Sequence, residues 1–338
     1  MCAPNLRGAP VLTFKVSGVD LYARNRAEHG KPSDAAENGM PVHASPLRTP
    51  TKHVRTICDG RVRSFGIKYV SAFTVSGRKL STGLAPSSMS RSCHDYNYLM
   101  QRWRCVARAA RLRVRSVATV DGFPVYCLRS PALSERGGLY LSAGIHGDEP
   151  ASTEGLLAWA QRFQSSIRYL PVMIFPCLNP WGLVMNSRFD AGGNDVNRAF
   201  HGDHHPTAAA VRQIAGPHLF DAAMLLHEDY DAQGLYLYEL SRELSIGGAI
   251  LRAAAAALPI DPRTRVEGRR LKDGVLRPRV LPRRVAKMGH PEAVWLYSLG
   301  CRRTITFETP SEAALELRTE AHERAVARML DLVITSSR

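Results

Sequence analysis

From His94 onward, the chain alternates between short apolar runs with the length of buried strands and longer segments with helical periodicity. This alternation favours a parallel sheet covered by helices, because a chain leaving a parallel strand must cross back over the sheet before it forms the next one. The sequence therefore predicts an α/β fold with a mixed, mostly parallel central sheet sandwiched between helices. The expected strands are 138–145, 169–178, 222–227, 234–240, 293–299 and 303–309, and the expected helices are 96–112, 154–163, 243–258 and 311–335.

The first 90 residues differ in composition from the rest of the chain. They are rich in glycine, proline, serine and basic residues, and they lack a regular apolar pattern. We expect residues 1–90 to form a disordered or weakly ordered basic extension and residues 91–338 to form the folded domain. Residues 1–88 hold 13 Lys and Arg against 5 Asp and Glu, so they carry more than half of the net charge of +15. No nucleic-acid-binding motif accompanies this charge, and we expect no specific nucleic-acid partner.

Apolar runs in the chain are too short for a membrane span. None approaches the roughly 18 residues that a transmembrane helix requires, and the first residues do not have the pattern of a secretory signal peptide. The sequence therefore predicts a cytoplasmic protein that does not enter the membrane. Met89, just before the first predicted helix, would serve as an alternative start. The oligomeric state is not predicted.

Polar residues gather where the predicted strands end. His146 follows strand 138–145, and Glu149 begins the next predicted helix. His227 ends strand 222–227, and Glu308 lies near the end of strand 303–309. The carboxyl ends of strands in such sheets are where ligands collect, so we expect these four side chains to meet at one edge of the sheet.

These residue types suit a catalytic zinc ion. Zinc takes imidazole nitrogen and carboxylate oxygen, and catalytic sites commonly use three protein ligands and one water, whose pKa the metal lowers to roughly 7. The His-x-x-Glu pair and the distant histidine supply such a set in His146, Glu149 and His227. Glu308 remains to take the proton of the water and pass it to a leaving amine. Cobalt or manganese would suit a similar nitrogen and oxygen site.

A second segment, 178–200, again follows an apolar run and carries Arg188, Asn197 and Arg198 in a loop with two glycines. Arginine keeps its charge, and its planar guanidinium is suited to hold a carboxylate or a developing oxyanion. Taken alone, the segment is equally consistent with an ordinary surface loop.

Together these motifs resemble the zinc carboxypeptidase family, which includes the succinylglutamate desuccinylase and aspartoacylase branch. The resemblance covers residues 94–338 and rests on motifs that occur in the family's order. They are GIHGDEP (144–150), NPWG (179–182), NDVNRAF (194–200), LLHED (225–229) and TFETP (306–310).

The resemblance implies a role for each matched position. His146, Glu149 and His227 would bind one zinc ion, and Glu308 would act as general base and then as general acid. Arg188 would hold the oxyanion. Asn197 and Arg198 would bind the free carboxylate of the substrate.

Two features of the family have no clear counterpart in this sequence. No motif identifies its substrate-side tyrosine, for which we choose Tyr297, with Tyr236 or Tyr238 as alternatives. Asp229 or Asp231 is a candidate to orient a zinc-bound histidine, although a solvated acidic loop explains them equally well.

We therefore expect a zinc-dependent metallocarboxypeptidase-type hydrolase that cleaves an amide bond next to a free carboxylate on a small peptide. The first alternative is a deacylase of N-acyl amino acids. The second is a non-catalytic member of the family that binds a carboxylated ligand.

Overall fold

The computed structural model describes residues 52–58, 61–67, 93–202, 204–278 and 289–336. The chain divides into two compact units, 13–79 and the remainder, and each is described by itself. In the smaller unit, β1 (Lys52–Cys58) and β2 (Arg61–Ile67) form an antiparallel hairpin with seven paired residues in each strand. The sequence analysis did not predict this hairpin. The rest of the predicted 1–90 extension lies outside the described residues.

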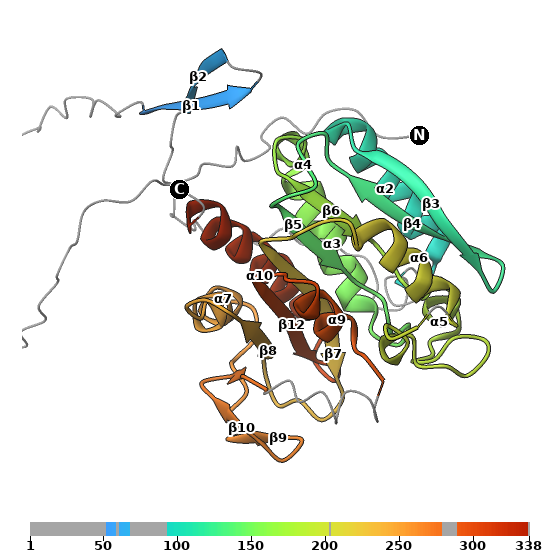
Figure 1. The fold of residues 1–338 in the computed structure, drawn as a ribbon. Coiled ribbons are helices and arrows are strands. Elements are labelled where there is room, and N and C mark those ends of the chain that lie inside the picture. Colours follow the sequence, from blue (N-terminus) through green and yellow to red (C-terminus); the bar gives the residue numbers. More distant parts are fainter. Residues whose placement is uncertain (1–51, 59–60, 68–92, 203, 279–288, 337–338) are drawn as a thin grey trace, which may run out of the picture. The chain divides into compact units, whose positions relative to one another are not determined.

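The larger unit is built on a mixed sheet, which has ten strands in the described part of the chain (Figure 1). The strand order is β3-β4-β6-β5-β7-β12-β8-β11-β10-β9. The strands are β3 (Arg113–Val120), β4 (Phe123–Arg129), β5 (Leu139–Ser142), β6 (Val172–Phe175), β7 (Ala222–Asp229), β8 (Tyr236–Ser241), β9 (Arg265–Val266), β10 (Arg269–Lys272), β11 (Val275–Leu276) and β12 (Arg303–Pro310).

The centre of this sheet is parallel. Strand β5 pairs in parallel with β6 and with β7, and β7 pairs in parallel with β12. Towards both edges the pairing becomes mainly antiparallel, because short connections such as the one between β3 and β4 return the chain directly alongside itself. The carboxyl ends of β5, β7 and β12 therefore lie together.

Helices cover both faces of the sheet (Figure 1). Helix α10 packs against α3 and α7, and α2 packs against α3 and α4, while α6 and α9 supply side chains to the apolar core of the other face. This arrangement confirms the predicted sheet between helices. The helices are α2 (Tyr96–Ala110), α3 (Pro150–Arg162), α4 (Gln164–Ile167), α5 (Pro180–Met185), the 3-10 turn η1 (Val196–Arg198), α6 (Pro206–Ala215), α7 (Gly247–Ala254), α9 (Glu292–Ser298) and α10 (Leu315–Ser336).

One expected element has a different conformation, and the last helix starts later than expected. The apolar run 293–299 was predicted as a strand, and that prediction is wrong, because these residues form α9. Trp295 and Leu296 are buried on this helix while Ser298 is exposed, so the run places one side on the core with helical spacing. The last helix begins at Leu315 rather than at Ser311. Among the helices in the described residues, none combines the length and apolar character needed to cross a membrane.

Candidate metal centre and active site

The three central strands bring the predicted site residues together. His146 lies in the loop after β5, His227 near the end of β7 and Glu308 near the end of β12. The parallel register of β7 and β12 places Glu308 directly beside His227. Glu149 occupies the N-cap position of α3, whose helix begins at Pro150.

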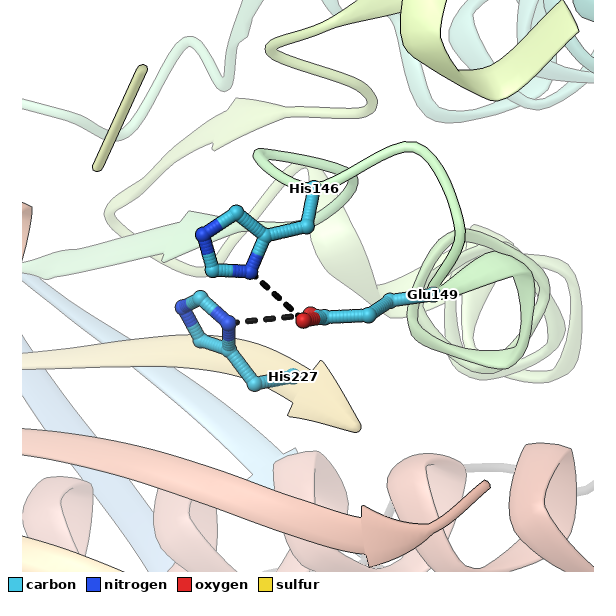
Figure 2. A group of neighbouring side chains, drawn as sticks. All are labelled: His146, Glu149 and His227. Atoms are coloured by element: carbon cyan, nitrogen blue, oxygen red, sulfur yellow. Dashed lines mark hydrogen bonds and ion pairs between the residues drawn. The ribbon is translucent and has the colours of Figure 1, made fainter. Parts of the chain in front are cut away.

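The side chains of His146, Glu149 and His227 point toward one another, as Figure 2 shows. Nδ1 of His146 lies 2.5 Å from one carboxylate oxygen of Glu149, and Nδ1 of His227 lies 2.9 Å from the other. One donor atom from each of the three residues lies within 4.8 Å of the others, and each residue is only 3% exposed.

This donor set fits a divalent transition metal. Two imidazole nitrogens and a carboxylate are the ligands that catalytic zinc uses, and they converge here from three separate segments. Burial raises the pKa of Glu149, but His146 and His227 outweigh it and lower that pKa below its ordinary value. Burial lowers the pKa of His146, yet Glu149 and Asp195 raise it to about 9. Positive charge is therefore favoured between these groups, and a metal cation would take that place.

Two glycines of the recognised motifs allow the first histidine to reach this position. A Cβ atom on Gly147 would lie 1.8 Å from the carbonyl carbon of Gly182 in α5. A Cβ atom on Gly182 would in turn lie 2.3 Å from the side chain of Asn179. The loop that carries His146 and Glu149 is thus pressed against α5 at a distance that only glycine permits.

Asp195 links the candidate metal ligands to the arginine loop. Its carboxylate lies 3.3 Å from Nε2 of His146 and accepts a hydrogen bond of 3.0 Å from Arg188. A carboxylate that holds the second ring nitrogen of a metal-binding histidine orients that ring. Burial raises the pKa of Asp195, but His146 and Arg188 lower it below its usual range. The sequence analysis did not consider Asp195 and named Asp229 or Asp231 as candidates for such a role.

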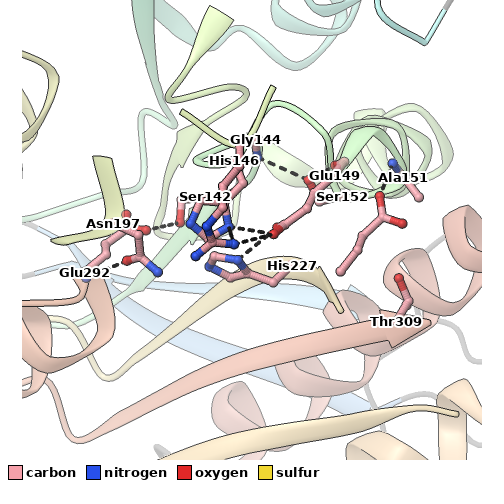
Figure 3. Close-up of polar contacts among 12 residues, drawn as sticks. Ser142, Gly144, His146, Glu149, Ala151, Ser152, Asn197, His227, Glu292 and Thr309 are labelled. Carbon is pink, nitrogen blue, oxygen red and sulfur yellow. Dashed lines mark hydrogen bonds and ion pairs between the residues drawn. The ribbon is translucent and has the colours of Figure 1, made fainter. Parts of the chain in front are cut away.

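Asn197 is held by the start of helix α9. Its Oδ1 accepts a hydrogen bond of 3.0 Å from the backbone N–H of Glu292, the first residue of α9 (Figure 3). The Glu292 carboxylate is buried and accepts hydrogen bonds from Tyr140 and from Ser142. Burial raises the pKa of Glu292 to about 7. Arg198 lines the same pocket and has no ion-pair partner in the described part of the chain.

The pocket beside these residues has a volume of about 300 Å³. One wall consists of paired side chains on β8 and β12, where Tyr236 lies opposite Glu308, Tyr238 opposite Thr306, and Leu240 opposite Thr304. Because side chains alternate along a strand, all six face the pocket. The wall becomes less polar away from Glu308, where Leu240 lies.

Glu308 has the environment of a proton-transfer group. It is buried, and burial together with Glu149 and Asp229 raises its pKa to about 8, although His227 and Arg188 act in the opposite direction. A carboxylate with a pKa near neutrality can both accept and return a proton.

Of the predicted site residues, Tyr297 is the one that the structure places elsewhere. It lies on α9, is absent from the pocket lining, and its ring stacks under the Arg242 guanidinium at 4.3 Å. The alternatives Tyr236 and Tyr238 do line the pocket, because the antiparallel pairing of β8 with β12 places them beside Glu308. Asp229 accepts a hydrogen bond of 2.8 Å from the Tyr236 hydroxyl rather than from a histidine.

Comparison with known sequences locates the family resemblance. Residues 136–229 match the model of the succinylglutamate desuccinylase/aspartoacylase catalytic domain. Murein peptide amidase A of Escherichia coli (strain K12) is 38% identical over 79 residues. That match covers 23% of this chain and 31% of the amidase, so it spans less than a third of the curated relative's length.

Solved structures share the fold over most of the larger unit. A Shewanella amazonensis protein provisionally assigned as a metallopeptidase has a TM-score of 0.64 at 19% identity, over 71% of this chain and 94% of that one. A metallo-carboxypeptidase from Burkholderia cenocepacia has a TM-score of 0.55 at 17% identity, over 72% and 70% of the two chains. The chain thus shares the fold of these structures, and its residues 136–229 resemble the succinylglutamate desuccinylase/aspartoacylase catalytic domain.

The segment that matches the family model contains the three candidate metal ligands and the arginine loop. Glu308 lies outside the matched segment. Its place in the site follows from the pairing of β12 with β7 rather than from sequence similarity.

Proposed function

We propose that this protein is a zinc-dependent hydrolase that cleaves an amide bond next to a free carboxylate. The observation that carries the proposal is the convergence of His146, Glu149 and His227 beside the buried carboxyl group of Glu308. Arg198, which has no ion-pair partner among the described residues, lines the same pocket and supplies the means to bind a carboxylate.

In the proposed reaction, each residue acts where the geometry places it. Arg198 and the amide of Asn197 bind the free carboxylate of the substrate. Arg188, held by Asp195, donates to the carbonyl oxygen as negative charge develops on it. Glu308 takes a proton from the attacking water and returns it to the leaving amine. Zinc held by the two histidines and Glu149 would polarise the carbonyl and lower the pKa of water to about 7.

We propose a short peptide as the substrate, because the curated relative is named as a murein peptide amidase. The second candidate is an N-acyl amino acid. It is favoured by the match of residues 136–229 to the desuccinylase and aspartoacylase catalytic domain. Both substrates present an amide and a free carboxylate, and they differ in the group on the acyl side.

Turnover assays of the full chain in zinc-containing buffer would separate these candidates. Short peptides with a free C-terminal carboxylate are compared with N-acetyl and N-succinyl amino acids, and with the same peptides amidated at the C-terminus. We expect cleavage of the free peptides and little cleavage of the amidated ones. Exclusive action on the acyl amino acids would contradict the peptidase assignment, and binding of all substrates without turnover would favour a non-catalytic carboxylate-binding protein.

A further inference from the structure

Helix α3 starts without help from its own N-cap side chain. The first N–H groups of a helix have no acceptor inside the helix, and the side chain of the N-cap residue commonly supplies one. Here the N-cap residue is Glu149, and it makes no capping hydrogen bond. Its carboxylate is instead directed at His146 and His227. The use of Glu149 as a candidate ligand therefore leaves the start of α3 in need of another acceptor.

That acceptor comes from the neighbouring strand. The backbone N–H of Ala151, at the first turn of α3, donates a hydrogen bond of 2.6 Å to Oε1 of Glu228. Arg318 on α10 donates to the other oxygen of the same carboxylate. The Glu228 side chain is fully buried, so no water replaces these partners. Figure 3 shows Ala151 at the start of the helix that follows Glu149.

Strand alternation lets two adjacent residues of β7 hold this helix start at two points. His227 and Glu228 project to opposite sides of β7. His227 contacts the side chain of Glu149, and Glu228 contacts the backbone two residues farther along. A shift of the first turn of α3 along its axis would break both contacts.

We propose that Glu228 is a positioning residue for the metal centre, which fixes the backbone of α3 so that the Glu149 carboxylate stays at the point where His146 and His227 meet. This inference rests on the proposed metal site. Residues that hold a ligand in place commonly contribute about 10- to 100-fold to metal affinity. We expect removal of the Glu228 carboxylate to weaken metal binding by that factor.

The chain contains a matched control for this arrangement. Glu239 on β8 is a buried carboxylate that accepts hydrogen bonds from the backbone N–H groups of Ile246 and Gly247 at the start of α7. An arginine, Arg277, donates to its other oxygen. Glu239 thus caps a helix from a strand in the same way as Glu228, but the residue before its helix is not a candidate metal ligand.

In the experiment, Co²⁺ is titrated into the metal-free full chain and into its Glu228→Ala, Glu228→Gln and Glu239→Ala variants. The visible spectrum of the bound ion reports metal binding, and the thermal unfolding temperature reports stability. We expect Glu228→Ala to bind Co²⁺ about 10- to 100-fold more weakly than the unmodified chain, with an altered spectrum. Glu228→Gln keeps one acceptor oxygen but presents an N–H group to Arg318, so we expect a smaller loss of Co²⁺ affinity, at least about threefold. If Glu228→Ala does not fold, the affinity of Glu228→Gln tests the inference. Glu239→Ala should lose stability and keep the affinity and spectrum.

Two results would overturn the inference. One is Co²⁺ affinity in the folded Glu228 variants equal to that of the unmodified chain. The other is an equal loss of affinity in Glu239→Ala, which would mean that general destabilisation is the cause. Failure of the unmodified chain to bind Co²⁺ would instead contradict the proposed function. In that case, hydrogen exchange of the metal-free protein still tests the capping contact. The backbone N–H groups in the first turn of α3 should exchange faster in Glu228→Ala than in the unmodified chain, and at an unchanged rate in Glu239→Ala. An unchanged exchange rate in Glu228→Ala would contradict the capping contact.

Discussion

The two halves of the candidate site are built differently. The metal half consists of His146, Glu149 and His227, which are almost completely buried. The substrate half consists of Arg188, whose side chain is 37% exposed, Asn197 and Arg198 in the same loop, and Tyr236 and Tyr238 on β8. The metal half is fixed by strand register and by the packed start of α3, whereas the substrate half projects into the pocket from a loop and from β8. Changes in the metal half should therefore abolish metal binding or folding stability, whereas changes in the substrate half should reduce substrate turnover by degrees.

The largest effect is expected at the point where the halves meet. Glu308→Gln removes the group that would move the proton while it keeps the shape of the side chain, so we expect turnover to fall by about 10²- to 10⁴-fold. Metal content and unfolding temperature should stay close to those of the unmodified chain. An unchanged rate would remove Glu308 from the proposed mechanism.

A smaller but still large effect is expected from the packing beneath the metal half. In Gly147→Ala, the added Cβ atom would meet backbone rather than a flexible side chain. We expect the free energy of unfolding to fall by about 3 kcal/mol and metal affinity to fall with it. Chemical denaturation measures the first quantity. Gly248→Ala in α7 is the control, because its nearest neighbour is the Arg252 side chain at 3.4 Å. Equal stabilities of the two variants would contradict the tight approach of Gly147 to α5.

The substrate half should respond by degree. Arg198→Ala removes the guanidinium that would bind the substrate carboxylate. A charge-assisted hydrogen bond is worth about 1.5–3 kcal/mol, so we expect kcat/KM to fall by about 10- to 100-fold for substrates with a free carboxylate. The matched substrate with an amidated end should lose much less. If both substrates lost the same factor, Arg198 would not be the carboxylate-binding residue.

The last effect is spread over several pH units and concerns a buried histidine behind the site. Burial and Arg318 lower the pKa of His322 to about 3, against 6.5 for the ordinary side chain. Between these values the unfolded chain binds a proton that the folded chain does not, so stability is lost as the pH falls from about 6.5. The loss is at most about 1.4 kcal/mol per pH unit at 25 °C.

Urea unfolding of metal-free protein between pH 7 and pH 4 measures this slope. We expect this slope to be shallower in His322→Gln than in the unmodified chain. Identical slopes in the unmodified chain and in His322→Gln would show that folding does not lower the pKa of His322.

Sequence analysis predicted that the candidate metal ligands and Glu308 would meet, because the signal for their positions is local. His146, Glu149 and His227 could be placed at strand ends from the apolar runs before them, and parallel strands end at one edge of a sheet. The same rule placed Glu308. All of these side chains lie together in the structure.

The substrate half depends on pairings that a single sequence does not encode locally. Tyr236 and Tyr238 reach the pocket because β8 pairs with β12 in antiparallel fashion, across more than 60 residues of chain. Tyr297 was chosen because it precedes Glu308 by a short distance in the sequence. It lies on α9, whose apolar sequence was equally consistent with a strand. Asp195 approaches His146 from 49 residues away. The cytoplasmic location stays a prediction.

The most direct test of the account is the metal content of the purified full chain, measured by elemental analysis beside its His227→Ala variant. The account predicts about one zinc per chain, since three converging protein ligands form one site, and loss of that zinc in the variant. A wild-type chain that holds no zinc after exposure to the metal, or a variant that holds as much as the wild type, would contradict the metal centre.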